Sequence, residues 1–315
     1  MIGKDSQGKI RNTRSIIQSE LRQIIKNSVQ SENGDIKIRK GINGQGVFIL
    51  IDNVRIAIDH WDLSAEILFV SHAHMDHIPQ KGFKKGEISI RDNRFPYVIC
   101  SKITRELMTY RTKGKFSFNN ESWLINGHTK NPISIDYKGL KFTILENGHA
   151  FGSNSLLIEG TKTIFYTSEF IIERRTLFGG ININELKPQS CDYLIIDATF
   201  GKPFYKFPSF NEIYTLTNKT INQYFQCGLS VILLGYSYGK SQLLLGMLNN
   251  DFKIYIGKDI GDIVKILEKN DIVFPNYKIY FKETKKELEA GSNFLFITSP
   301  TELSKNPILS LINSG

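Results

Sequence analysis

Cysteine is scarce in this chain of 315 residues, and long hydrophobic runs are absent from it. The three cysteines, Cys100, Cys191 and Cys227, are far apart, so we expect core thiols and neither a disulfide framework nor a C-x-x-C metal knuckle. No apolar run reaches the roughly 20 residues of a membrane span, and the first residues lack the apolar segment of a signal peptide. We therefore expect a soluble chain in the cytoplasm, without a membrane partner.

Histidine is also rare, yet three of the six histidines lie within residues 71–77, where the sequence reads SHAHMDH. This segment directly follows the apolar run ILFV at 67–70. A tight loop after a buried strand can direct imidazoles and a carboxylate inward, where Zn²⁺ accepts nitrogen and oxygen ligands. The spacing H-x-H-x-D-H therefore predicts a metal site rather than a solvated polar turn with incidental histidines.

A metal site of this kind needs a further ligand from elsewhere in the chain, and His149 is the candidate. It lies in NGHAFGS at 147–153, between the apolar runs at 140–145 and 154–158. The small residues of this segment allow the backbone to turn sharply beneath an imidazole. A histidine in such a turn is more often structural, but together with the H-x-H-x-D-H loop we predict that it is a ligand.

Basic residues outnumber acidic ones, and the formal net charge is +9. The excess is concentrated in the N-terminal segment, where residues 1–50 carry nine Lys and Arg against four Asp and Glu. Such a field suits a polyanionic partner such as nucleic acid, since neutralising phosphates releases counterions. The same charge can also serve solubility alone.

The order of apolar runs divides the chain into three parts. Residues 15–29 have a helical period and belong to a basic helical segment at 1–35, which either reaches a substrate or packs on the rest of the protein; we favour packing. Strand-like runs follow at 67–70, 97–100, 140–145, 154–158, 163–167 and 193–197, and they predict a two-sheet sandwich covered by helices at 36–201.

After residue 201 the pattern changes to alternating helices and strands, which predicts a smaller parallel α/β domain at 202–315. The expected helices span 212–227, 241–248 and 260–269, and the expected strands span 231–234, 253–256, 278–281 and 293–298. The fold class is therefore α/β.

Residues 148–153 (GHAFGS) and the apolar strand after them resemble the third motif, G-H-x-x-G-S, of the β-CASP nucleases. These form the branch of the metallo-β-lactamase superfamily that processes RNA and DNA. Their fourth motif typically reads Y-T-G-D-F, and this chain has YTSEF at 166–170, so Glu169 occupies the place of a metal-bridging aspartate. The resemblance implies an αββα sandwich with a β-CASP cap and two zinc ions, one held by His72, His74 and His149 and the other by Asp76, His77 and Glu169.

Catalytic roles for Asp76, His77 and Glu169 follow from the same resemblance, with Asp76 also steering the attacking water. Residues 192–201 (DYLIIDATFG) resemble the segment that precedes the cap in this family, where Asp197 would orient a ligand imidazole through its free ring nitrogen. Asp59, at the end of the strand-like run 54–58, is a similar candidate. A plain strand-end aspartate is the alternative for Asp197.

Residues 235–241 (GYSYGKS) are one position too short for a phosphate-binding P-loop. Residues 236–244 (YSYGKSQLL) instead resemble a strand–turn–helix segment of the β-CASP cap, which commonly reads A-L-G-R-A-Q-E-L, with Lys240 at the usual arginine position. A cation at a helix N-terminus can bind a substrate phosphate, so we predict nucleic-acid contacts from Tyr238, Lys240 and Ser241. A tight turn with a merely solvated lysine is the alternative.

These patterns predict a zinc-dependent nuclease that acts on RNA or single-stranded DNA, with an exonuclease of RNA processing as the leading interpretation. The alternative is a weak or inactive homologue that binds nucleic acid as a subunit. A hydrolase of small thioesters or lactams would not need a cap of this size. The family has further histidine-bearing motifs after its cap, whereas no histidine follows His149 here. We therefore expect either a fragment or a shortened member that binds its second metal ion less firmly. The sheet edge left unpaired without those motifs favours a homodimer.

Overall fold

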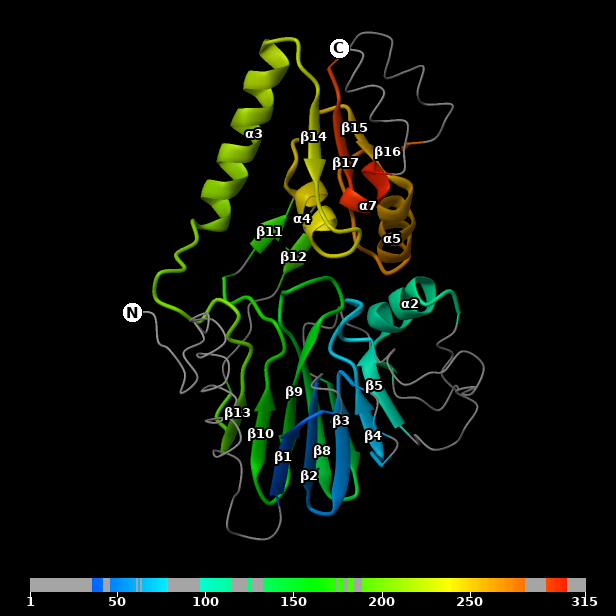
Figure 1. Cartoon of the computed structure of the whole chain (residues 1–315), viewed down its shortest axis with the longest axis vertical. Coiled ribbons are helices and arrows are strands. Elements are labelled where there is room, and N and C mark those ends of the chain that lie inside the picture. Colours follow the sequence, from blue (N-terminus) through cyan, green and yellow to red (C-terminus); the bar gives the residue numbers. More distant parts are fainter. Residues whose placement is uncertain are drawn as a thin grey trace, which may run out of the picture.

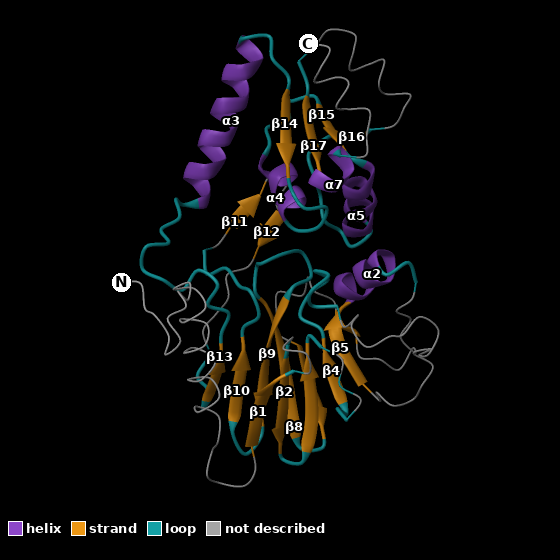
Figure 2. Ribbon diagram, viewed as in Figure 1, coloured by secondary structure: helices purple, strands orange, loops and turns teal. Residues whose placement is uncertain are grey.

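The computed structural model describes residues 36–41, 46–60, 62, 64–78, 97–114, 124–125, 133–173, 175–177, 181–183, 189–280 and 293–304. Within these residues, two sheets face each other in the lower half of the molecule and a third sheet lies above them (Figures 1 and 2). The expected basic segment at 1–35, with its helix at 15–29, lies outside the described residues.

The first sheet has six strands, which follow one another in sequence order. They are β1 (Ile36–Lys40), β2 (Val47–Ile51), β3 (Val54–Ile58), β4 (Ile67–Phe69), β5 (Tyr97–Ser101) and β6 (Leu124–Ile125). Strands β1 to β3 are antiparallel, while β3 to β6 are parallel. Asp52 and Asn53 have positive φ and form the two-residue turn between β2 and β3, as expected for this pair of residue types.

The second sheet has five strands in the order β13-β10-β9-β8-β7. They are β7 (Ile133–Tyr137), β8 (Leu140–Glu146), β9 (Asn154–Glu159), β10 (Thr163–Tyr166) and β13 (Tyr193–Ile195). Strands β7 to β10 form an antiparallel meander, and β13 pairs parallel to β10 at one edge of the sheet. The predicted strands from residue 67 to residue 197 are confirmed to within two residues at each end.

The core between the two sheets follows the two-residue period of a strand. Ile49 and Ile51 of β2 pack against the second sheet, whereas Phe48 and Leu50 belong to a cluster on the opposite face. Helix α2 (Lys102–Arg111) supplies Ile103, Leu107 and Met108 to that outer cluster. The inner strands of the first sheet therefore pack on both faces, which fixes the positions of the loops at their ends.

The third sheet is wholly parallel, with the order β14-β17-β15-β16. Its strands are β14 (Val231–Leu234), β15 (Ile254–Ile256), β16 (Lys278–Ile279) and β17 (Leu295–Thr298), and its helices are α3 (Phe210–Gln226), α4 (Lys240–Met247), α5 (Lys258–Glu268) and α7 (Pro300–Leu303). A capping box between Ser209 and Glu212 begins α3. The predicted α/β alternation is confirmed, with ends within two residues of those expected.

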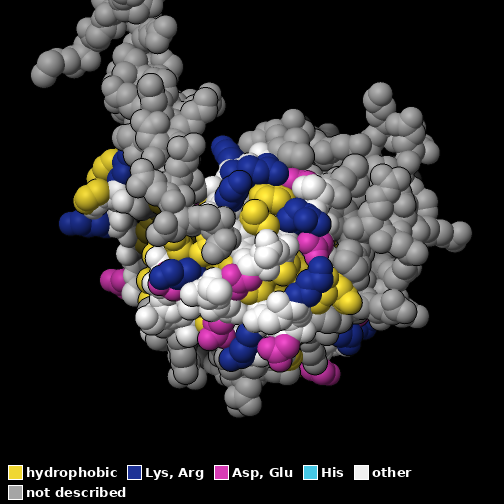
Figure 3. Space-filling view, turned by 90° about the horizontal axis from the view of Figure 1, so that it is seen from below, with side chains coloured by type: hydrophobic (Ala, Val, Ile, Leu, Met, Phe, Trp, Pro, Cys, Tyr) yellow, Lys and Arg dark blue, Asp and Glu magenta, His cyan; other side chains and the backbone are white. Residues whose placement is uncertain are grey.

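The parallel sheet lies over one end of the two-sheet layer, with α2 and the pair β11 (Arg175–Leu177) and β12 (Ile181–Ile183) between them (Figure 1). One apolar cluster includes side chains of α2, α4 and α5, so the two parts share buried contacts. Figure 3 shows the opposite end of the two-sheet layer, where charges of both signs are interspersed. The chain is thus a mixed α/β protein, and its division at residues 201 and 202 stays a prediction.

The helices of the described residues are all too short or too polar to cross a membrane.

Gly46 provides a test of how tightly the first sheet is packed behind Asp59. Its φ is +59°, and a Cβ there would lie 2.1 Å from the carbonyl oxygen of Ile58 and 2.9 Å from the carbonyl carbon of Asp59. We expect Gly46→Ala to lower the free energy of unfolding by about 3 kcal/mol, because the clash adds to the cost of a positive φ. Gly139→Ala is the matched control, since Gly139 has φ +82° with open space around it; we expect a loss of about 1 kcal/mol. Equal losses in urea unfolding would contradict this account.

Candidate metal centre

The histidine-rich loop begins where β4 ends. All three residues of β4 are fully buried, and the chain continues through Val70, whose amide donates a hydrogen bond to Ile99 of β5. The backbone then turns back at residues 74–78, where the amides of His77 and Ile78 both donate to the carbonyl oxygen of His74. This turn places His72 in the protein interior and His74 at its boundary.

The second loop connects β8 and β9 and carries His149. Gly148 and Gly152 have positive φ, which provides the sharp turn that the small residues predict. The hydroxyls of Ser101 and Thr104, at the start of α2, donate to the carbonyl oxygen of Gly152 at 2.7 and 2.8 Å. A Cβ at Gly152 would lie 2.7 Å from the Ile103 side chain, so only glycine fits this contact between the loop and α2.

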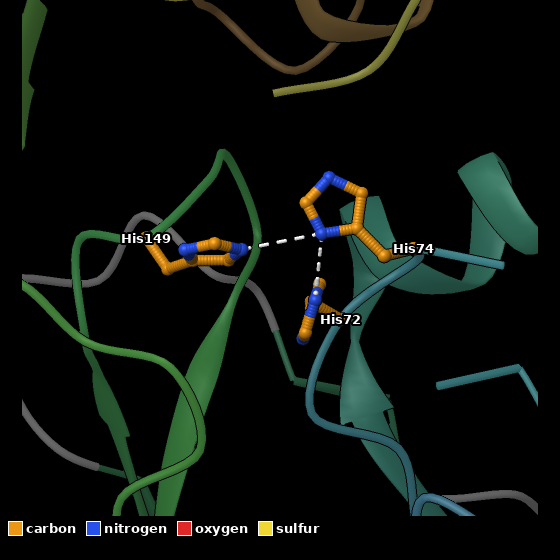
Figure 4. Close-up of side chains that lie close together, drawn as sticks. All are labelled: His72, His74 and His149. Carbon is orange, nitrogen blue, oxygen red and sulfur yellow. Dashed lines mark hydrogen bonds between the residues drawn. The ribbon is translucent and has the colours of Figure 1, made fainter. Parts of the chain in front are cut away.

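The two loops bring three imidazoles together (Figure 4). The Nδ1 atom of His74 lies 2.8 Å from Nε2 of His72 and 3.2 Å from Nε2 of His149. Ligand atoms around a tetrahedral ion with bonds of about 2.0 Å are about 3.3 Å apart, so this spacing is close to that of a metal site. His72, His74 and His149 thus form one group whose nitrogen atoms can hold a cation together.

Burial keeps these three imidazoles neutral. It lowers the pKa of His72 well below the usual value, lowers that of His74, and lowers that of His149 to about 4. A neutral imidazole offers the nitrogen lone pair that a metal ion requires. The electrostatics of the group therefore suit metal ligation.

A second group consists of His72, His77 and Glu169. Glu169 follows β10 and places Oε1 3.1 Å from Nε2 of His77 and Oε2 3.8 Å from Nε2 of His72. Although burial raises the pKa of Glu169, His77 lowers it to about 2, so the side chain is a carboxylate. His72 belongs to both groups, and Glu169 lies close to both His72 and His77.

His77 is held differently from the other three histidines. Its Nδ1 lies 3.0 Å from the Asp59 carboxylate, and its Nε2 faces Glu169. Burial alone would lower the pKa of His77, but Asp59 and Glu169 outweigh it and raise that pKa to about 11. A cation binding here would therefore compete with a proton for the same nitrogen atom.

Asp59 organises the base of the site through three neighbours. Its carboxylate accepts hydrogen bonds from the Ser71 amide and hydroxyl at 2.7 Å each, and from the Tyr166 hydroxyl at 2.8 Å. Together with the contact to His77, these bonds join the end of β3 to the histidine loop and to β10. The structure thus places Asp59 behind a candidate ligand imidazole, the arrangement that orients metal ligands in proteins.

Asp76 and Asp197 lie farther out than the sequence suggests. The Asp76 side chain is 76% exposed, 3.9 Å from Nε2 of His77, and it belongs to neither group of ligand atoms. The Asp197 carboxylate accepts hydrogen bonds from the amide and hydroxyl of Thr199, which form a local turn. Within the described part of the chain it forms no hydrogen bond with an imidazole, although its charge acts on His149.

The turn before α4, which carries the predicted nucleic-acid contacts, lies directly against the histidines. Tyr238 is only 1% exposed, its carbonyl oxygen lies 3.2 Å from Nε2 of His74, and its hydroxyl donates to Phe151 at 2.7 Å. Since a carbonyl only accepts, Nε2 of His74 carries the proton, and Nδ1 keeps its lone pair toward His72 and His149. Buried in this way, the Tyr238 ring exposes no face to a base in this structure, and its contact with nucleic acid stays a prediction.

The other two predicted contacts in this turn differ from each other. Ser241 is fully buried and donates to the carbonyl oxygen of Tyr236, so it offers no group to a nucleic acid. Lys240 is exposed at the start of α4, with its ammonium 5.8 Å from the Tyr236 ring. Gly239, between Tyr238 and Lys240, has φ +94°, and a Cβ there would lie 3.1 Å from Nε2 of His74. Only Lys240 therefore remains available for a nucleic acid.

Sequence reasoning missed Ser71 and Tyr166, the partners of Asp59. Tyr166 is the first residue of the segment YTSEF, and Ser71 is the first of SHAHMDH, so both lay in motifs already singled out. The missing information was the direction of their hydroxyl groups. That direction depends on how the ends of β3, β4 and β10 meet in the fold and cannot be read from spacing.

Comparison with known proteins finds several relatives, although no family model matches the chain. The "Probable DNA ligase" of Opitutus terrae is 30% identical over 217 residues, which cover 67% of this chain and 18% of that protein. The "RNase J-like protein" of Methanocaldococcus jannaschii is 27% identical over 204 residues, which cover 60% of this chain and 44% of that protein. "Protein artemis" of Rattus norvegicus is 29% identical over 175 residues, which cover 50% and 24% respectively. The chain therefore spans less than half the length of these curated relatives.

Among solved structures, a protein of unknown function from Enterococcus faecalis matches with a TM-score of 0.50 at 12% identity. The match covers 80% of this chain and 73% of that one. At this identity the likeness concerns the fold alone.

The Tyr238 hydroxyl provides a test of the contact between the turn and the histidine loops. We expect Tyr238→Phe to lower the free energy of unfolding by about 1 to 3 kcal/mol, because it leaves the Phe151 carbonyl without its partner. We also expect zinc affinity, measured against a chromophoric chelator, to fall about tenfold, because the loop that carries His149 loses this contact. Tyr236→Phe, at a side chain 68% exposed, should leave both quantities unchanged. Wild-type zinc affinity in the Tyr238 variant would show that the turn does not position the ligands.

Proposed function

Because this chain belongs to the metallo-β-lactamase superfamily and to its β-CASP branch, we propose that it is a metal-dependent nuclease that hydrolyses phosphodiester bonds in RNA or single-stranded DNA. The names of two relatives, "RNase J-like protein" and "Protein artemis", support a nucleic-acid substrate. The observation that carries the proposal is the convergence of His72, His74 and His149 beside a second group of ligand atoms.

We propose zinc as the metal, since imidazole nitrogen and carboxylate oxygen suit this ion. His72, His74 and His149 would hold one ion, and Asp76, His77 and Glu169 would hold the second. When bound, such ions activate water as a nucleophile and stabilise negative charge on phosphate oxygens. The neutral state of the first three imidazoles, which burial imposes, supports this assignment.

The side chains around the ions would divide the remaining work. Asp59 fixes the His77 ring from behind, at 3.0 Å, while Glu169 contacts the other side of the same ring. Asp76 is exposed beside His77 and can accept a proton from an attacking water. Tyr236 and Lys240, both exposed on the turn above His74, offer a ring face and a positive charge to an unpaired nucleotide.

The fold proposal follows the same family. We propose that the two facing sheets form the αββα sandwich, in which α2 is one outer helix, and that the parallel sheet with α3, α4 and α5 is the β-CASP cap. We also propose that the substrate binds between cap and sandwich, beside the contact of the Tyr238 turn with His74. The cytoplasmic location and the homodimer remain proposals from the sequence; the exposed Leu194 at the edge strand β13 supports association.

Within this function, we propose an exonuclease of RNA processing. The alternative is a subunit that binds nucleic acid without cleaving it, and the specific observation in its favour is Glu169 in place of the bridging aspartate. Glutamate carries its carboxylate on a longer stem, which can alter the separation of two ions. Hydrolysis of end-labelled RNA and single-stranded DNA by protein of known zinc content separates the two. Stepwise release of mononucleotides supports an exonuclease, whereas binding without cleavage at full zinc occupancy supports the alternative.

Metal removal and a change at Glu169 test the proposal on the same assay. We expect a chelator to abolish hydrolysis and added zinc to restore it. Glu169→Gln should reduce the rate at least about 100-fold, because it removes a negative ligand beside His77. Glu159→Gln, which changes a carboxylate paired with Lys141 on the surface of the second sheet, should retain the wild-type rate. Hydrolysis that persists in the metal-free protein would refute a metal-dependent nuclease.

A further inference from the structure

Arg111 lies between the two parts of the molecule, close to the histidines, and has no role in the site described above. It is the last residue of α2, the helix that lies between the two-sheet layer and the parallel sheet (Figure 1). The Tyr110 hydroxyl donates to Asp262 of α5 at 3.1 Å, and Glu106 accepts a hydrogen bond from Asn270 at 2.9 Å. These two contacts, made by residues one turn apart in α2, hold the helix in place. They therefore fix the position from which the Arg111 side chain extends.

The Arg111 guanidinium lies beside the predicted metal loop. Its central carbon is 5.8 Å from the centre of the Tyr238 ring, and that ring is 4.9 Å from the centre of the His74 ring. The positive charge also acts electrostatically on His72 and His74, and the negative charge of Asp76 acts on it. Arg111 is therefore near enough to the proposed metal ligands to reach a phosphate bound there.

No carboxylate of the described residues pairs with this guanidinium. Its Nε atom is buried and has no hydrogen-bond partner, although the residue as a whole is only half-buried. Arginines on the surface of the first sheet are paired, Arg39 with Asp62 at 2.9 Å and Arg55 with Glu66 at 3.0 Å. A partly buried positive charge without a partner is unfavourable, and an anionic ligand would remove this cost.

We propose that Arg111 binds a phosphate of the nucleic-acid substrate next to the metal centre. This inference rests on the proposed nuclease function and names a residue that would contact its substrate. A guanidinium presents several N–H groups in a planar fork that matches two phosphate oxygens at once, and its charge does not depend on pH near neutrality.

A purely structural role is the competing explanation. At 5.8 Å from the Tyr238 ring, Arg111 can contribute a weak cation–π contact that helps to hold the turn. In that case its removal would reduce stability and metal binding together. A substrate contact instead predicts weaker substrate and phosphate binding at unchanged stability and metal content.

The experiment compares Arg111→Gln and Arg111→Lys with Arg105→Gln in the full-length, zinc-loaded chain. Arg105 is a half-buried arginine of the same helix whose charge acts on Cys100 rather than on the histidines, which makes it a matched control. The readouts are KM and kcat for a single-stranded oligonucleotide, inhibition by inorganic phosphate, oligonucleotide binding at several salt concentrations, zinc content and Tm.

We expect Arg111→Gln to raise KM and the inhibition constant of inorganic phosphate about tenfold or more, and Arg111→Lys to give a smaller increase. The slope of log affinity against log salt should fall by about 1, as for the loss of one phosphate contact. Zinc content and Tm should match those of Arg105→Gln. Unchanged phosphate and oligonucleotide binding would overturn the proposal, and so would losses that appear only together with lower Tm and zinc content.

The binding measurements separate this inference from the nuclease function. If the zinc-loaded wild-type protein binds the oligonucleotide but does not cleave it, the nuclease proposal fails. The salt dependence of binding and the affinity for phosphate then still test whether Arg111 binds a phosphate. If the wild-type protein cleaves and the Arg111 variants bind as it does, the nuclease proposal stands and the Arg111 proposal fails.

Discussion

The meeting of three neutral imidazoles from two separate loops is the interaction on which the rest of the structure depends. His72 and His74 follow β4, and His149 lies between β8 and β9, so their nitrogen atoms converge only if the two sheets pack in the correct register. The apolar core between the sheets maintains that register, because a slip of one residue would turn each inward side chain outward. Burial then keeps the rings neutral and able to bind a cation. Packing and electrostatics thus act on the same few atoms.

Two sets of contacts hold the imidazoles from outside. On the side of the two-sheet layer, Asp59 accepts hydrogen bonds from Ser71 and Tyr166 and contacts His77. On the opposite side, the Tyr238 turn contacts His74 through its carbonyl oxygen and the His149 loop through its hydroxyl. The parallel α/β part therefore does more than cover the site, since its backbone determines which nitrogen of His74 carries the proton. A change in the position of this turn would therefore act directly on His74, a proposed metal ligand.

The sequence was sufficient for most elements and for the histidines that the structure brings together, but not for most contacts between distant segments. Apolar patterns predicted the named strands between residues 67 and 197, and the helices and strands after residue 201, to within two residues, because burial of one face imposes the period. Helix α2 and strand β7 were not predicted. The H-x-H-x-D-H spacing singled out His72, His74 and His77, since short loops after buried strands leave few directions for a side chain. The burial of Tyr238 was not foreseen, because this residue contacts a histidine 164 positions earlier in the chain. Arg111 was missed for the same reason, since its position beside Tyr238 and the histidines arises only in the folded chain.

The location of a bound metal ion tests the central claim most directly. A crystal soaked with zinc and measured at the zinc absorption edge would show each ion by its anomalous scattering. We predict a peak about 2.0 to 2.1 Å from Nε2 of His72, Nδ1 of His74 and Nε2 of His149, with further density beside His77 and Glu169. Zinc bound elsewhere, with none within bonding distance of these three nitrogen atoms, would contradict the account.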